Sequence, residues 1–120
     1  MKELEQTYEY EGSSAEKAIV KTVTAAILLD AYGVLLTERQ REYLSLFYEE
    51  DLSLAEIGKK FSITRQAVHD TIRHGEAQLL AYEKALRLVE KARARQKIIQ
   101  KLITLTGNTQ QINELLEQLL

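Results

Sequence analysis

Residues 52–74 of this chain read LSLAEIGKKFSITRQAVHDTIRH, two short helical patterns joined by a three-residue break. Ser53 and Glu56 form a capping box, in which the hydroxyl accepts from a first-turn N–H and the carboxylate accepts from the Ser53 N–H. The first helix therefore begins directly after Ser53. Thr64 can cap the second pattern with its hydroxyl, so we expect helix from Arg65 onward.

Two helices joined this closely form a helix-turn-helix, whose second helix can enter the major groove of DNA. The spacing turns Ala67, Val68 and Ile72 inward and leaves polar side chains outward. Arg and Gln make bidentate contacts to guanine and adenine, and a helix start offers N–H groups to a phosphate. The nucleic-acid-binding residues are expected to be Lys59, Lys60, Thr64, Arg65, Gln66, His69 and Arg73. Other small helical bundles contain such capped pairs, so the spacing alone leaves a purely structural role open.

The composition is that of a nearly all-helical chain. The 120 residues include no proline and no cysteine, and good helix formers are abundant. This length suits one domain with its own core, and without cysteine there are no disulfides or thiolate metal sites. The longest apolar run, residues 25–29, is too short for a bilayer, and acidic residues stand where a signal peptide would be apolar. We expect a cytoplasmic protein without membrane insertion.

The net charge of −2 opposes nucleic-acid binding, because non-specific affinity comes mainly from neutralising phosphates. The charges are unevenly distributed, however. Acidic residues crowd residues 1–16, whereas residues 84–101 are mainly basic. The helix-turn-helix carries four Lys and Arg residues against Glu56 and Asp70. This modest basicity is typical of weak or assisted binding.

Two helices are expected before the motif. Ser13 and Glu16 form a capping box that opens a helix through Tyr32, which Gly33 ends in the left-handed conformation. The apolar face of this helix is expected at Ile19, Val20, Val23, Ile27 and Ala31. The next helix follows Thr37. Its aromatic-rich face, interpreted as core in preference to a base-stacking platform, is Tyr43, Leu44, Phe47 and Tyr48.

The C-terminal third predicts long helices with a packing seam. Helical character runs from Arg65 toward Leu105, and Gly75 is where we expect a bend or boundary. Gly107 and Asn108 break the chain before a last amphipathic helix. Leucine stripes need a partner surface, which favours a homodimer over the alternative of an intramolecular fold-back. The dimer interface is expected at Leu79, Tyr82, Leu86, Val89, Ile99, Leu102, Leu116 and Leu119.

Three parts of the chain follow from these patterns. They are a flexible acidic segment over residues 1–12, a helical domain over 13–76 with the helix-turn-helix at 53–74, and C-terminal helices over 77–120. No catalytic arrangement is visible, because His69 and His74 fall on different sides of a helix without partners at ligand or relay spacing. We expect neither an enzyme, nor a metal site, nor a cofactor.

A resemblance to a known family lies in residues 35–76, which read LLTERQREYLSLFYEEDLSLAEIGKKFSITRQAVHDTIRHGE. This stretch resembles the YlxM family of small helix-turn-helix proteins, which look like region 4 of bacterial sigma factors. The matching positions are Leu35, Leu36, Thr37, Gln40, Tyr43, Asp51 to Leu54, Glu56, Ile57 and Arg65 to Val68. The chain departs from the family pattern at His69 and Thr71, where Tyr and Asn are usual. It departs again at Ser62, a turn position that usually holds Gly, and at Gly58, where Ala is frequent.

The helical patterns and this resemblance predict an all-α helical bundle containing a sigma region-4-like helix-turn-helix, with a long C-terminal helical extension. The family is usually encoded beside the GTPase of the signal recognition particle, which implies an accessory role in that pathway. Two functions stay open. One is a homodimeric regulator that binds DNA or the RNA of the signal recognition particle. The other is a protein-interaction module that binds the GTPase of the particle without reading nucleic acid.

Overall fold

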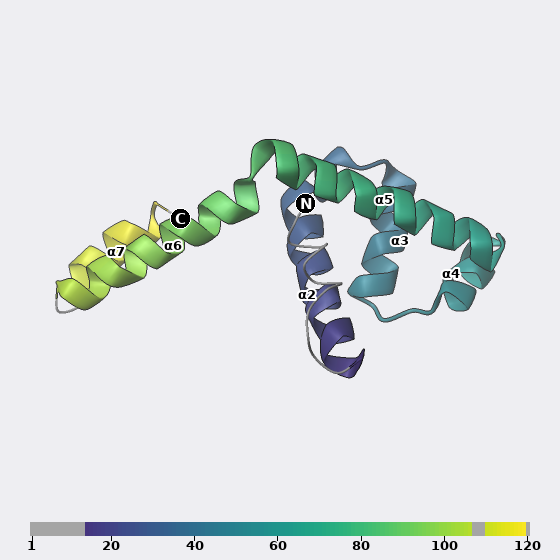
Figure 1. Cartoon of the computed structure of the whole chain (residues 1–120), viewed down its shortest axis with the longest axis horizontal. Helices are drawn as coiled ribbons and strands as arrows, with labels where there is room; N and C mark the ends of the chain where they lie inside the picture. The colour runs from purple at the N-terminus through teal and green to yellow at the C-terminus, as the bar shows by residue number, and fades with distance from the viewer. Residues whose placement is uncertain (1–13, 107–109, 120) are drawn as a thin grey trace. The chain divides into compact units, whose positions relative to one another are not determined.

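The computed structural model of the chain describes residues 14–106 and 110–119, with side chains described from residue 21 onward. Within these ranges the chain forms six α-helices, one short 3₁₀ helix and no strand (Figure 1). The elements are α2 (Ser14–Tyr32), η1 (Gly33–Leu35), α3 (Glu38–Tyr48), α4 (Leu54–Phe61), α5 (Arg65–Leu86), α6 (Leu88–Leu105) and α7 (Gln110–Glu117). The predicted all-α fold is confirmed. The segment 1–12 and the expected cap at Ser13 lie outside the described residues.

The chain divides between Arg87 and Leu88 into two compact units. The first contains α2 to α5, and the second contains α6 and α7. The division follows a change in the backbone, because α5 ends at Leu86 and Arg87 takes a left-handed conformation with φ of 55°.

Gly75, where we expected a bend, lies within an unbroken α5. A Cβ built on Gly75 would lie 2.7 Å from Leu44 Cδ1 of α3. The missing side chain therefore allows α5 to approach α3 closely, so this glycine is a packing residue. The expected division between residues 76 and 77 also falls inside α5, because the helix continues through the contact with α3.

The first unit is organised around α5, which packs against α2, α3 and α4. Its fully buried side chains come from all four helices, so one core joins them. They are Leu28, Tyr32, Tyr43, Leu44, Ile57, Val68 and Leu79. The aromatic face of α3 is core as predicted: Tyr43 and Tyr48 are buried, Phe47 is half-buried, and the Tyr43 and Phe61 rings lie 4.9 Å apart between centroids.

The buried face of α2 differs from the predicted one. The side chains of Ile19 and Val20 lie outside the described ones. Of the other predicted residues, Ile27 is half-buried, whereas Val23 is 53% exposed and Ala31 is exposed. The buried side chains are Ala25, Leu28, Leu29 and Tyr32. This helix is apolar on more than one side, so its sequence is compatible with two overlapping apolar faces. Packing against α3 and α5 decides which of the two faces is buried.

Helix α2 ends at Tyr32 as predicted, but the predicted conformation of Gly33 was wrong. Gly33 does not take a left-handed φ, and it begins η1 directly after Tyr32. The Leu36 N–H donates to the Gly33 carbonyl at 3.1 Å. This hydrogen bond closes a tight 3₁₀ turn, which keeps the backbone right-handed.

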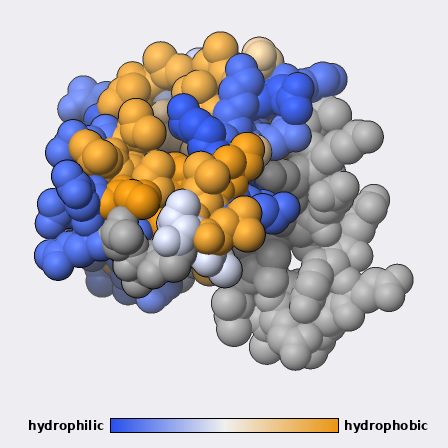
Figure 2. All heavy atoms as spheres, turned by 90° about the vertical axis from the view of Figure 1, so that its left-hand side faces the viewer, coloured by the Kyte–Doolittle hydropathy of each residue, from blue (hydrophilic) through white to orange (hydrophobic). Residues whose placement is uncertain are grey.

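The second unit is a hairpin in which α7 packs against α6. Ile99 is buried between its neighbours, and Ile103, Ile112 and Leu116 are half-buried. Five leucines described in this unit stay exposed, with exposed fractions from 45% to 83%: Leu88, Leu102, Leu105, Leu115 and Leu119. In Figure 2 this unit faces the viewer, and apolar side chains gather over it. The helices α6 and α7 therefore fold back on each other within one chain, and their contact leaves an apolar face exposed. Among the described helices, none is both long and apolar enough to cross a membrane.

Candidate nucleic-acid interface

The first helix of the motif, α4, begins with the predicted capping box. The Glu56 N–H donates to the Ser53 hydroxyl at 3.1 Å, and the Ser53 N–H donates to the Glu56 carboxylate at 3.1 Å. Two hydrogen bonds with Ser53 lower the pKa of Glu56. The larger effect comes from the Ser53 backbone and the smaller one from the Ser53 side chain. The carboxylate is therefore stabilised in its charged form, and the start of α4 is fixed.

The turn between α4 and α5 consists of Ser62, Ile63 and Thr64. Ser62 takes the left-handed conformation, with φ of 57° and ψ of 42°, at the position where glycine is common in this motif. The Ile63 N–H donates to the Gly58 carbonyl at 2.9 Å. The Thr64 hydroxyl accepts from the Ala67 N–H at 3.0 Å, which confirms the predicted cap of α5. The turn is thus held at both ends by hydrogen bonds.

The first two turns of α5 present the predicted faces. Val68 and Ile72 are buried and Ala67 is half-buried, so the inward face is formed. Arg65, Gln66 and Arg73 are exposed, and the side chain of His69 is 40% exposed. Arg73 lies eight residues after Arg65, which is roughly 12 Å along the helix axis. The two guanidinium groups are therefore placed to reach different parts of a ligand.

Lys59 and Lys60 are exposed in the last turn of α4, five and four residues before Thr64. Cations at this end of a helix are stabilised by its dipole. The Lys60 Nζ lies 5.8 Å from the centroid of the Phe61 ring, so the aromatic ring helps to hold one of the two charges. Both lysines add positive charge close to the capped start of α5.

Asp70 lies on the same outward face and was not among the predicted site residues. Its side chain is 58% exposed, and its Oδ1 accepts from the Gln66 Nε2 at 2.9 Å. The same oxygen lies 3.6 Å from the His69 Nδ1. The signal in the sequence was the spacing of four residues between Gln66 and Asp70, which places two side chains together on a helix.

The predicted dimer residues fall into two groups. Leu79 is fully buried in the core of the first unit, and Tyr82 is half-buried with its hydroxyl donating to the Leu35 carbonyl at 3.2 Å. Val89 and Ile99 are also buried, and Leu116 is half-buried. Leu86, Leu102 and Leu119 are exposed. Leu79 therefore packs in the core of its own unit. The sequence did not reveal this, because a row of apolar side chains has the same helical spacing whether it packs within the chain or against a second copy.

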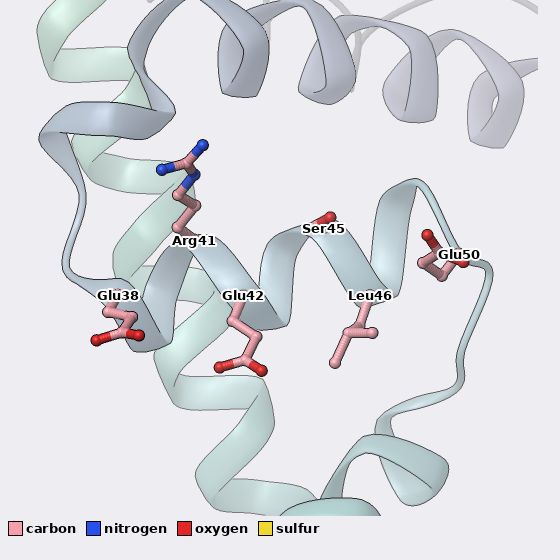
Figure 3. Close-up of a pocket in the computed structure, with 6 residues that line it drawn as sticks. All are labelled: Glu38, Arg41, Glu42, Ser45, Leu46 and Glu50. Carbon is pink, nitrogen blue, oxygen red and sulfur yellow. The ribbon is translucent and has the colours of Figure 1, made fainter.

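A shallow pocket of about 330 Å³ lies along α3 (Figure 3). Its lining residues are Glu38, Arg41, Glu42, Ser45, Leu46 and Glu50. Glu38, Glu42 and Leu46 project to one side of α3, whereas Arg41 projects to the other. Three carboxylates against one guanidinium make this surface unsuited to a phosphate backbone. Among the described residues, no group of three or more His, Cys, Asp or Glu side chains could hold a metal ion.

A capped α4, a left-handed turn and an α5 with an exposed polar face define a helix-turn-helix protein. Known sequences agree with this class. The family described as "Putative helix-turn-helix protein, YlxM / p13 like", UPF0122, matches residues 19–119. The chain belongs to this family.

Several relatives from bacilli are 44% identical to this chain. They include the UPF0122 proteins of Bacillus cereus strain AH187, Bacillus anthracis strain A0248 and Bacillus thuringiensis subsp. konkukian strain 97-27. Each alignment spans 98 residues, which is 82% of this chain and 89% of the relative. The family match over residues 19–119 includes the C-terminal helices as well as the helix-turn-helix.

Proposed function

We propose that the chain is a nucleic-acid-binding regulatory protein that places the outward face of α5 in the major groove of DNA. The observation that carries this proposal is the start of α5, where the exposed Arg65 and Gln66 directly follow a capped N-terminus. The major groove of DNA admits a helix, whereas that of A-form RNA is too deep and narrow for side chains to read. DNA is therefore the ligand that this geometry favours.

Each element of the motif has a chemical task in this complex. Arg65 is suited to guanine and Gln66 to adenine, because their side chains match the groove edges of these bases. The N–H groups at the start of α5 are suited to a phosphate, as are Lys59 and Lys60 at the end of α4. Base contacts supply the sequence preference, and phosphate contacts supply position and most of the salt dependence.

The test is selection of a preferred site from a random DNA pool, followed by affinity measurements on single variants. Arg65→Ala is expected to cost about 1–3 kcal/mol at the selected site. Lys59→Ala and Lys60→Ala are expected to reduce the salt slope without changing the preference. Arg39→Ala, an exposed arginine of α3, is the matched control and should leave binding unchanged. Unchanged affinity of Arg65→Ala for every selected DNA would contradict the proposal.

A second candidate function is a protein-interaction module that binds the GTPase of the signal recognition particle. The exposed leucines of α6 and α7 favour this candidate, as does the net charge of −2. An accessory role in that pathway rests on the family resemblance. Binding to DNA, to the RNA of the particle and to the GTPase should be measured as salt is raised. Affinity for a nucleic acid falls steeply with the logarithm of the salt concentration, whereas an apolar protein contact persists.

We also propose that the chain acts as a homodimer through α6 and α7. Dimeric helix-turn-helix proteins bind two half-sites separated by a helical turn of DNA or a multiple of it. Two copies would double the weak positive charge that one motif offers, which suits a chain of modest basicity.

A further inference from the structure

We infer that Asp70 sets the specificity of the α5 face, by orienting the Gln66 amide toward a base and by repelling phosphates from the middle of the helix. This inference rests on the proposed function and goes beyond it, because it assigns a positioning and specificity role to an acidic residue. The evidence is the hydrogen bond of 2.9 Å between Gln66 Nε2 and Asp70 Oδ1, on an exposed part of α5.

The hydrogen bond fixes which way the Gln66 amide faces. An unconstrained glutamine samples many rotamers and must lose that freedom when it binds a base edge. With one N–H held by Asp70, the side chain still offers its second N–H and its carbonyl oxygen. One donor beside one acceptor matches the N7 acceptor and N6 donor of adenine. Asp70 thus prepares Gln66 for adenine before binding.

The negative charge of Asp70 acts in a second way. Asp70 lies between Gln66 and Arg73 in the sequence and is more than half exposed, so it faces whatever approaches the centre of α5. A phosphate there would meet a like charge. Among the described side chains, the ion-pair contact of Asp70 is the long one with His69, 3.6 Å between the Asp70 Oδ1 and the His69 Nδ1. Base edges carry no net charge and avoid this penalty. The residue therefore weakens non-specific binding more than binding to a preferred site.

Two substitutions at this position separate orientation from charge. Asp70→Asn removes the charge and keeps an oxygen that can accept from Gln66, whereas Asp70→Ala removes both. In both variants, affinity for random-sequence DNA should rise about fivefold, the change expected for one interaction between unit charges about 4 Å apart in water. The preference for a particular base pair opposite Gln66 should persist in Asp70→Asn and be lost in Asp70→Ala.

The control variants use the full chain and separate the possible failures. Glu42→Gln removes a negative charge from α3 and should change neither measurement. Gln66→Ala should abolish the same base preference as Asp70→Ala, and the double variant should lose no more than either single one. If the wild-type chain selects no DNA site, the proposed function fails. If it selects a site whose preference survives Asp70→Ala, only the inferred role of Asp70 is overturned.

Discussion

The backbone carbonyl of Ile63 lies 2.8 Å from the position that a Cβ on Gly58 would occupy. The two residues are also joined by the hydrogen bond from the Ile63 N–H to the Gly58 carbonyl. The turn of the helix-turn-helix thus passes directly over this glycine. The absence of a side chain at Gly58 allows the start of α5 to lie close to α4.

Gly58→Ala is therefore expected to destabilise the protein, although alanine is the better helix former by roughly 0.5–1 kcal/mol. A contact of 2.8 Å with a backbone atom cannot be relieved by rotating a side chain, so the turn must shift. Overpacking of this kind costs about 1–3 kcal/mol. Urea denaturation measures the change. A variant as stable as the wild type would show that the turn is looser than this geometry requires.

Ser62→Gly should be neutral or stabilising, by up to about 1 kcal/mol. Ser62 has φ of 57°, a conformation that glycine accepts without the steric cost of a Cβ. The gain is partly offset, because glycine increases the entropy of the unfolded chain. Thermal melts of Ser62→Gly beside Gly58→Ala test both substitutions on one element. A loss above about 1 kcal/mol in Ser62→Gly would contradict the left-handed assignment.

Local signals predicted the functional motif well, because its determinants lie a few residues apart. The caps at Ser53 and Thr64 each join side chains to backbone atoms within three residues, and both form as expected. Gly75 could not be interpreted in the same way. Its role depends on Leu44, which is distant in sequence and meets it only after α3 and α5 pack.

The same limit explains why the sequence predicted neither the buried face of α2 nor the partner of the C-terminal packing seam. Periodicity indicates that a stripe is apolar, but not which partner covers it. Leu79 is covered by the core of its own unit, whereas Leu102 is left exposed. Asp70 was missed for a different reason: in the sequence it stands only as a negative charge opposing the basic residues of the motif, and its hydrogen bond to Gln66 is seen only in the structure.

The capping box of α4 should make a pH-dependent contribution to stability. Hydrogen bonds from Ser53 lower the pKa of Glu56 below its ordinary value of 4.5. A carboxyl group whose pKa is lowered by folding stabilises the protein above the ordinary value, and this contribution is lost as the pH falls through the lowered pKa. Glu56→Gln is the matched variant, because glutamine can complete the box without titrating. The difference in unfolding free energy between wild type and variant should shrink from about pH 7 to about pH 3. A constant difference would contradict the prediction.

Two buried tyrosines of α3 should respond oppositely to the loss of their hydroxyl groups. The Tyr48 hydroxyl donates to the buried Glu76 carboxylate of α5, so Tyr48→Phe should cost about 1–3 kcal/mol by removing that donor. The Tyr43 hydroxyl is buried without a hydrogen-bond partner among the described residues. Tyr43→Phe should therefore be neutral or stabilising. Urea denaturation of the pair compares the same chemical change on one helix. Equal losses would show that the hydrogen bond to Glu76 is not the cause.

The apolar face of the second unit should hold two copies of the chain together. Leu102 and Leu119 are exposed although α7 already packs against α6, so the fold-back does not use them. Light scattering at micromolar concentration should give twice the mass of one chain. Leu102→Asp and Leu119→Asp should each shift the protein toward the monomer, because a charge would have to be desolvated at the interface. Val34→Asp is the control: Val34 is 74% exposed in the first unit, so the same change there should leave the mass unaltered. A wild-type monomer, or a dimer that survives both leucine variants, would contradict this arrangement.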